Sequence, residues 1–359
     1  MSAADETEEP LFSGYRGRVL LSITGGSFFI SMVAMVIPPL LPRIRAEFGI
    51  SAAEAGLLMT VWWLAVALLN APGGRIADEL THKTGLVAGL GIAFLGTLIL
   101  SNANLYALLI VAIAIVGGGR GIYQPSAIAQ ISDLYVKRRA QALGFRGAAF
   151  NLGGVVSGVL VAGILTVTTW RIAFVPMLVG IGGVIVCMHV WNREPYEFAR
   201  VQLNVRETLS RLGRSRELVS VIAALSLFAF AWTGTLTFLP SFLQFEKGLS
   251  STWASVAFSG VFVVGTIVQP LYGTVGDRRG HAIAACVAAI ATAGGLGGVL
   301  SAARPASLAI ALLVLSFGLA AFWPVMMAFG LQRLSSRTLA GDWGAITAIF
   351  LSVEALGSL

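Results

Sequence analysis

GRIADELTH at residues 74–82 returns 199 positions later as GTVGDRRGH at residues 273–281. Two further sets of residues keep the same offset: Glu47, Gly49 and Ser51 with Glu246, Gly248 and Ser250, and Gly119 and Pro125 with Gly318 and Pro324. One offset that holds over three separated segments indicates that the chain consists of two similar halves.

The repeated segments lie among long apolar runs. The chain has 359 residues, of which 57% are hydrophobic and 11% are charged, whereas a soluble domain has about a quarter charged residues. A helix needs roughly twenty residues to cross a ~30 Å hydrocarbon core. Eleven apolar segments approach that length: 18–41, 53–76, 84–103, 105–130, 141–166, 171–192, 217–243, 251–275, 281–302, 306–331 and 343–359. In lipid only helices satisfy their backbone polar groups within one segment, so we predict an all-α membrane protein.

The basic residues predict the orientation. With the N-terminus in the cytoplasm, seventeen of the 24 Lys and Arg residues fall on the cytoplasmic side and five on the outer side. The net charge of +7 therefore reflects the inner membrane surface, and we expect no nucleic-acid partner.

Residues 1–10 are acidic and polar, which does not fit a signal peptide. Cys187 and Cys286 fall inside apolar segments and predict neither a disulfide framework nor a metal site.

The chain divides into four parts. Residues 1–16 are a predicted cytoplasmic tail, 17–192 a six-helix bundle, 193–216 a cytoplasmic linker, and 217–359 a second bundle of five helices. The charged linker fits an amphipathic helix at the inner surface or a solvated connection, and both interpretations stay open. By the repeat, the counterpart of the sixth segment would end near residue ~390. We therefore expect that a twelfth helix is missing and that the chain is truncated.

Several motifs resemble the major facilitator superfamily. The loop after that family's second helix reads Gly-x-Leu-Ala-Asp-Arg-x-Gly-Arg-Arg. Residues of both copies match it: Gly74, Ile76, Ala77 and Asp78 in the first, and Gly273, Asp277, Arg278 and Gly280 in the second. The stretch GGGRGIYQP at 117–125 is similar to the family's fourth helix, and Trp170 with Arg171 to the start of its sixth. The resemblance covers the chain from about residue 17, and implies the family's fold of two pseudo-symmetric six-helix halves, of which eleven helices are present here.

The resemblance also implies a gate at the cytoplasmic side, formed by Gly74, Asp78, Gly273, Asp277, Arg278 and Gly280. Glycines let neighbouring backbones approach closely. Asp78 would face the start of the eleventh segment near Gly341, and Asp277 the start of the fifth near Arg139. A carboxylate at a helix N-terminus contributes about 0.3–1 kcal/mol. A static packing role for this loop is the alternative.

Three charged residues lie inside apolar segments, where insertion costs about 2.5–3.5 kcal/mol. We expect Arg120 to face an aqueous cavity and attract an anion. Glu354 fits a protonatable coupling group, although it also lies near the end of the chain. For Arg146 we favour a side chain that reaches the inner surface by snorkelling.

Polar and aromatic residues inside the segments would complete a substrate site: Asn70, Tyr123, Gln124, Asn151, Trp232, Gln269 and Trp323. Trp62 and Trp63 are expected to face lipid or to pack against other helices. The fifth segment carries NLGGVVSG at 151–158, without the proline of the Gly-Pro-x-x-Gly-Gly run that is typical of proton-driven drug exporters. This absence disfavours a drug antiporter without excluding it.

The sequence has no phosphate loop, no metal-ligand cluster and no catalytic set of residues, so we expect no enzyme and no cofactor.

Two halves of membrane helices favour a secondary active transporter that works by alternating access. We expect a monomer in the plasma membrane that moves a small organic solute, with an anionic solute favoured, coupled to H+ as a symporter or antiporter. An efflux antiporter for amphipathic compounds and a receptor that binds without transport are the alternatives. The excess of Arg over Lys and the abundance of Ala and Gly favour a prokaryotic source.

Overall fold

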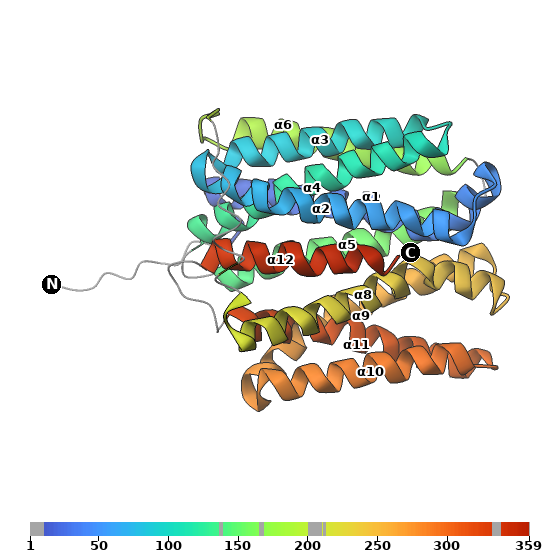
Figure 1. Cartoon of the computed structure of the whole chain (residues 1–359). Coiled ribbons are helices and arrows are strands. Elements are labelled where there is room, and N and C mark those ends of the chain that lie inside the picture. Colours follow the sequence, from blue (N-terminus) through green and yellow to red (C-terminus); the bar gives the residue numbers. More distant parts are fainter. Residues whose placement is uncertain are drawn as a thin grey trace.

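The computed structural model describes residues 11–135, 139–164, 169–199, 210, 213–331 and 339–358. Within these ranges the chain forms eleven α-helices and one short 3-10 helix, with no strand. The helices lie side by side along one long axis (Figure 1). The all-α prediction is therefore confirmed.

The first half, residues 17–192 of the prediction, forms α1 (Gly14–Phe48), α2 (Ala52–Glu79), α3 (His82–Asn102), α4 (Tyr106–Leu134), α5 (Arg139–Ile164), the 3-10 helix η1 (Trp170–Phe174) and α6 (Val175–Trp191). The second half forms α8 (Arg216–Phe245), α9 (Ser251–Arg279), α10 (His281–Ser301), α11 (Pro305–Leu331) and α12 (Leu339–Leu356). Ten of these helices are long and apolar enough to cross a membrane. In α12 the apolar stretch Ala345–Leu356 is shorter, and the helix ends partway along the bundle (Figure 1).

The repeat has a structural cause at the turn between the first two helices of each half. Gly49 and Gly248 both adopt a left-handed backbone, with φ of 65° and 69°, which glycine tolerates without strain. Ser51 and Ser250 then cap the next helix: the side chain of Ser51 accepts from the amide of Glu54 at 3.2 Å, and that of Ser250 from the amide of Trp253 at 3.3 Å. The same residue types therefore turn the chain between these two helices and start the second of them in both halves.

The glycines of the repeat let helices pack closely within each half. A Cβ added at Gly119 would lie 2.6 Å from the amide nitrogen of Ala93 on α3. A Cβ at Gly318 would lie 2.4 Å from the amide nitrogen of Thr292 on α10. Small residues allow this approach between membrane helices. In both halves a glycine of the fourth helix thus allows that helix to pack closely against the third.

The two halves meet along a surface that we call the seam, where α5 packs on α9, α2 on α12 and α1 on α8. Figure 1 shows α5 and α12 between the remaining helices of the two halves. We call the end of the bundle that is predicted to face the cytoplasm the inner end, and the opposite end the outer end. α1 begins at Gly14, slightly before the predicted boundary of the tail at residue 16.

The predicted linker is only partly visible. Residues 193–199 follow α6 without forming a helix, and residues 200–209 and 211–212 lie outside the described residues. The amphipathic helix is therefore not found in the first described part of the linker and stays a prediction for the remainder.

Candidate functional site

Arg120 lies on α4 between two aromatic rings. Its guanidinium carbon is 5.1 Å from the ring centre of Trp63 on α2 and 4.7 Å from that of Phe150 on α5. Desolvated cation–π contacts of this kind contribute about 2 kcal/mol. The rings fix the guanidinium but satisfy none of its hydrogen bonds, and Nε and Nη1 are buried without a partner. Unmet buried donors of a charged group are costly, so Arg120 presents two donors that an anion could satisfy.

Glu354 on α12 faces Arg120 from the other half. Its side chain is 2% exposed, and its Oε1 accepts a hydrogen bond of 2.7 Å from the hydroxyl of Thr233 on α8. The two groups are near enough for their opposite charges to attract each other across the seam. The structure therefore brings together the two ionisable residues that we singled out for substrate binding and for coupling.

Arg146 on α5 does not fit the expected snorkelling. Its Nε is buried without a hydrogen-bond partner, and its charge acts on Arg120 and on Tyr123. Arg120 and Tyr123 lie one turn apart on α4, on the same face of that helix. Arg146 is therefore near enough to Arg120 and Tyr123 of α4 for its charge to act on both, and its buried Nε does not reach solvent at the inner surface.

Asn151 and Gln269 form a second link across the seam. The Asn151 Nδ2 on α5 donates to the Gln269 Oε1 on α9 over 3.0 Å. Both residues were predicted for the site, and they come from different halves of the chain. Their amides are partners of each other in this structure, so a substrate that used them would have to exchange this bond for its own.

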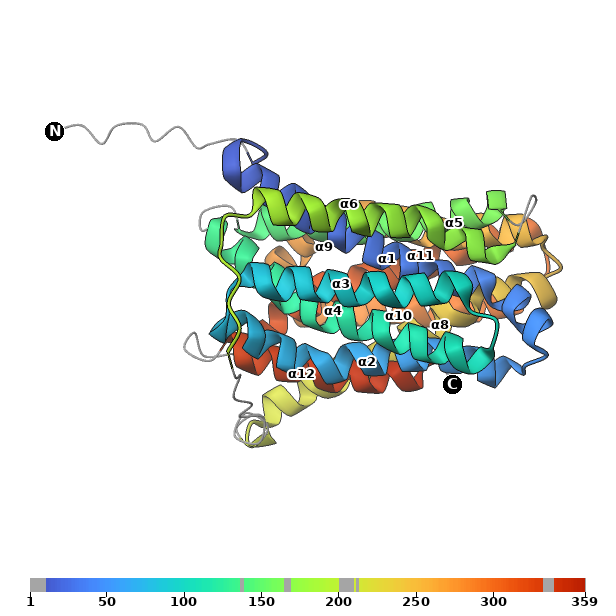
Figure 2. The ribbon, with the colours of Figure 1, turned by 90° about the horizontal axis from the view of Figure 1, so that it is seen from above.

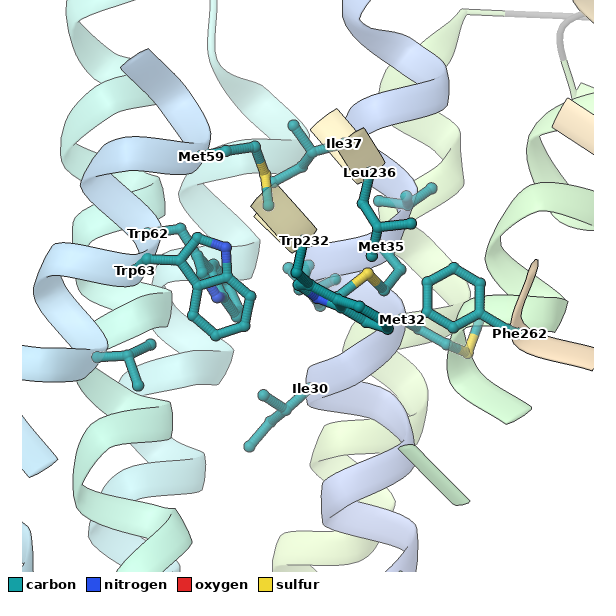
Figure 3. Close-up of a cluster of buried hydrophobic side chains, with 14 of the residues drawn as sticks. Ile30, Met32, Met35, Ile37, Met59, Trp62, Trp63, Trp232, Leu236 and Phe262 are labelled. Atoms are coloured by element: carbon teal, nitrogen blue, oxygen red, sulfur yellow. The ribbon is translucent and has the colours of Figure 1, made fainter. Parts of the chain in front are cut away.

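The second half contributes an aromatic cluster to the seam. The rings of Trp232 and Trp323 meet edge to face with centres 6.2 Å apart, and Phe350 lies 5.6 Å from Trp323. Figure 3 shows Trp232 extending from α8 toward Met32 and Met35 of α1. The two predicted tryptophans thus form an apolar wall in the second half.

Tyr123 and Gln124 occupy different environments on α4. The Tyr123 hydroxyl donates to the carbonyl oxygen of Ile23 on α1, and the residue is 2% exposed. A Cβ at Gly26 would lie 2.5 Å from this hydroxyl oxygen. Tyr123 therefore packs α4 against α1, while Gln124 is half-buried. A direct substrate contact for either residue stays a prediction.

The structure adds Trp63, Phe150 and Thr233 to the residues that the sequence predicted for the site. Trp62 and Trp63 are 0% and 5% exposed, so lipid contact is wrong and packing is confirmed. Asn70 is also buried, and its Nδ2 has no partner. It lies two turns after Trp63, so both share one face of α2. That spacing was the available signal for Trp63, whereas nothing in the sequence marked Phe150 or Thr233.

The seam is tightly closed toward the outer end. The hydroxyls of Thr60 on α2 and Ser358 after α12 are 2.8 Å apart, and the Ser259 hydroxyl on α9 donates over 2.9 Å to the carbonyl of Val155 on α5. A Cβ at Gly158 would lie 2.6 Å from the carbonyl oxygen of Ser255. Small side chains and backbone carbonyls thus join the halves there.

At the inner end, the segment after α6 crosses the ends of α3 and α4 (Figure 2). We call residues 192–199 with these helix ends the clasp. The Glu194 carboxylate accepts from the backbone amide of Lys83 at 2.9 Å and from the Gln130 Nε2 at 3.2 Å, and lies 3.2 Å from the His82 Nδ1. The Lys83 ammonium donates to the carbonyl of Asn192 at 2.7 Å.

The charge balance of the clasp favours an ionised Glu194. Partial burial raises the pKa of this carboxyl, but the hydrogen bonds from His82 and Lys83 outweigh it and leave the pKa below its ordinary value. His82 also lies 3.6 Å from the carboxylate of Asp133 on α4. The last residue of the first repeated motif is thus held between two carboxylates.

The predicted gate is described only in part. The side chains of Asp78 and Asp277 and the surroundings of Gly273 lie outside the described part of the structure, so the contacts of these residues stay predictions. Gly280 ends α9 with a φ of 93°, and Arg278 is exposed. Among the described residues, a Cβ at Gly74 would meet no atom within 4 Å, so a close-packing role for this glycine stays a prediction. The neighbouring Gly73 has such a role, since its Cβ would lie 2.5 Å from the carbonyl oxygen of Gly121.

Two halves of packed membrane helices, with opposed charges at the seam between them, define the architecture of a membrane carrier. The family model of the Major Facilitator Superfamily matches residues 23–359. The chain belongs to this superfamily, whose members are multi-pass membrane transporters and not enzymes.

Known proteins agree with this assignment. The chain is 25% identical over 278 residues to a "Probable sulfoacetate transporter" of Cupriavidus necator, covering 72% of this chain and 65% of that protein. It is 27% identical over 245 residues to a "Probable L-galactonate transporter" of Escherichia coli, covering 61% of this chain and 52% of that protein. The chain thus spans between half and two thirds of the length of these relatives.

Solved structures share the fold. A bacterial homologue of the human lysosomal transporter Spinster, in an inward-facing and unoccupied conformation, superposes with a TM-score of 0.81 at 19% identity, covering 98% of this chain and 82% of that one. A D-xylose–proton symporter superposes with a TM-score of 0.74 at 15% identity, covering 96% of this chain and 88% of that one. At such identities the likeness concerns the fold alone.

Proposed function

We propose that this chain is a secondary active transporter that moves a small organic anion across the plasma membrane together with protons. The observation that carries this proposal is Arg120, whose two buried donors have no partner although the guanidinium is fixed between Trp63 and Phe150. A preorganised cation with free donors favours a carboxylate or a similar oxyanion.

Glu354 supplies a mechanism for coupling. While it is ionised, its charge attracts Arg120 and competes with a substrate anion. Once it is protonated, Arg120 loses that competitor and binds the anion more strongly. Because two linked equilibria affect each other reciprocally, a bound anion also favours the proton on Glu354. Substrate and proton would therefore load together.

Alternating access would use the two ends of the seam. The outer contacts of Thr60 with Ser358 and of Ser259 with Val155 would part in one state, and the inner motifs around Asp78 and Asp277 would part in the other. The excess of basic residues at the inner end supports an N-terminus in the cytoplasm. We propose that one chain works as a monomer, because the seam lies within it.

The named substrates of relatives support an anion. Sulfoacetate and L-galactonate are organic acids, as is the hexuronate of a Bacillus subtilis transporter that is 24% identical over 246 residues. The aromatic cluster of Trp232, Trp323 and Phe350 favours a second candidate, the export of amphipathic compounds. A Bacillus subtilis multidrug transporter, 29% identical over 182 residues, is among the relatives.

Proteoliposomes test the proposal. The purified chain is reconstituted, a pH gradient is imposed, and the accumulation of labelled organic anions and of a cationic dye is measured. Proton-driven anion accumulation that fails in Arg120→Gln supports the proposal. Dye loading restricted to inside-out vesicles would favour the exporter, and binding without any accumulation would identify a receptor.

A further inference from the structure

The seam holds a second guanidinium that the proposed coupling of Arg120 with Glu354 does not use. The Nε of Arg146 is buried without a hydrogen-bond partner, as are Nε and Nη1 of Arg120. The positive charge of Arg146 acts against that of Arg120. Two like charges that repel in a desolvated place are unfavourable unless a negative group joins them.

The charges of the seam indicate how much negative charge is missing. Among the described residues, two charged side chains inside the helices act on Arg120: Arg146 repels it and Glu354 attracts it. With Glu354 ionised, these three groups leave one positive charge. With Glu354 protonated, they leave two. A substrate that enters with a proton on Glu354 would therefore have to carry two negative charges to neutralise the site.

The helices place the backbones of the two arginines at different depths. Arg146 lies seven residues after the start of α5 at the inner end, about 10 Å along the helix, and Arg120 lies fourteen residues before the inner end of α4, about 21 Å along it. Two acid groups on a short connecting chain match this arrangement better than a single compact oxyanion does.

We infer that Arg146 is a second substrate-binding residue, and that the site takes a small organic dianion with two separated acid groups, bound together with one proton on Glu354. This inference rests on the proposed function, since it uses the same seam. The inference goes beyond the proposed function in two ways. It names the substrate class, and it gives a role to Arg146, which the sequence analysis placed at the membrane surface.

Matched pairs of acids test the inference by binding alone. The thermal stability of the purified chain is titrated with succinate against butyrate, glutarate against valerate, and malonate against propionate, at about pH 6 where these dicarboxylates are largely ionised. In the wild-type protein we expect at least one dicarboxylate to bind about tenfold more tightly than its monocarboxylate partner. Arg146→Gln should abolish this preference, Arg146→Lys should keep much of it, and Arg304→Gln, which removes an exposed charge at the start of α11, should leave it unchanged.

A second measurement needs no arginine variant. Calorimetric titration of the wild-type chain in buffers of different ionisation enthalpy gives the protons taken up with the dicarboxylate, and we expect about one, which Glu354→Gln removes. A wild-type protein without any preference for dicarboxylates, or a preference that survives in Arg146→Gln, would overturn the inference. Dicarboxylate preference without proton-driven accumulation would overturn the transport proposal instead.

Discussion

The two halves of the molecule share a scaffold but not its chemistry. Gly119 and Gly318 hold equivalent helices together, and Ser51 and Ser250 cap equivalent helices. The charged residues are not repeated. At the same offset, Arg120 is matched by Leu319, Arg146 by Ala345 and Glu354 by Val155. The packing positions are thus duplicated because both bundles need them, whereas each half contributes different groups to the seam.

This difference divides the site between the halves. The first half supplies two guanidinium groups with unpartnered donors, and the second half supplies one carboxylate that Thr233 already holds, together with an aromatic wall. The first half is therefore suited to bind an anion and the second to exchange a proton. Variants at Arg120 and Glu354 would test this division, and variants at the repeated glycines would test the shared scaffold.

The largest effect is expected at Arg120. Arg120→Gln removes the charge and the two donors that would hold an anion, so we expect proton-driven uptake of the substrate to fall about a hundredfold or more, which corresponds to at least ~2.7 kcal/mol. Arg120→Lys keeps the charge but loses the planar guanidinium, so its uptake should lie between that of the wild type and that of Arg120→Gln. Uptake into proteoliposomes measures this. Unchanged uptake in Arg120→Gln would show that the anion binds elsewhere.

A smaller, different effect is expected at Glu354. Glu354→Gln keeps the shape and stays uncharged, so the anion should still bind, and counterflow of unlabelled against labelled substrate should continue. Accumulation driven by a pH gradient should drop about tenfold, because no proton accompanies the substrate. If gradient-driven accumulation persisted in this variant, the second half would not carry the coupling group.

The shared scaffold predicts equal effects in the two halves. Gly119→Ala and Gly318→Ala each place a methyl group within 2.6 Å of a neighbouring backbone atom. We expect each to destabilise the protein by about 1–3 kcal/mol. Gly91→Ala and Gly294→Ala are matched controls, since their Cβ atoms meet nothing within 4 Å. Melting temperatures in detergent check this, and a large loss in only one half would contradict the symmetry of packing.

The smallest effect is expected in the clasp, at the inner end of the first half. Glu194→Gln should cost about 1 kcal/mol at neutral pH, because a half-buried carboxylate is partly screened by solvent. The pKa of Glu194 lies below the ordinary 4.5, so its carboxylate stabilises the fold above that pH and loses this effect as the pH falls through the lowered value. The difference in melting temperature between the variant and the wild type should therefore shrink below about pH 4. A difference that grew on acidification would contradict this assignment.

The sequence predicted the helices well because their signal is local. The segment predicted at 251–275 is α9, Ser251–Arg279, and that at 84–103 is α3, His82–Asn102. Arg120 and Glu354 were found because a charge is conspicuous in an apolar run. Arg146 was misplaced because its distance from the helix end suggested the surface, while the rotation of α5 about its own axis decides where the side chain points.

The amino-acid sequence alone determined that this is a two-half helical membrane protein of a transporter family, since apolar length, basic loops and a constant repeat offset are all properties of the linear chain. Only the tertiary structure decided which helix faces meet at the seam. These helices are apolar on nearly all sides, so no periodicity told that Phe150 of α5 would reach Arg120, or that Thr233 of α8 would reach Glu354. Packing of glycines and small side chains sets those rotations, and with them the chemistry of the site.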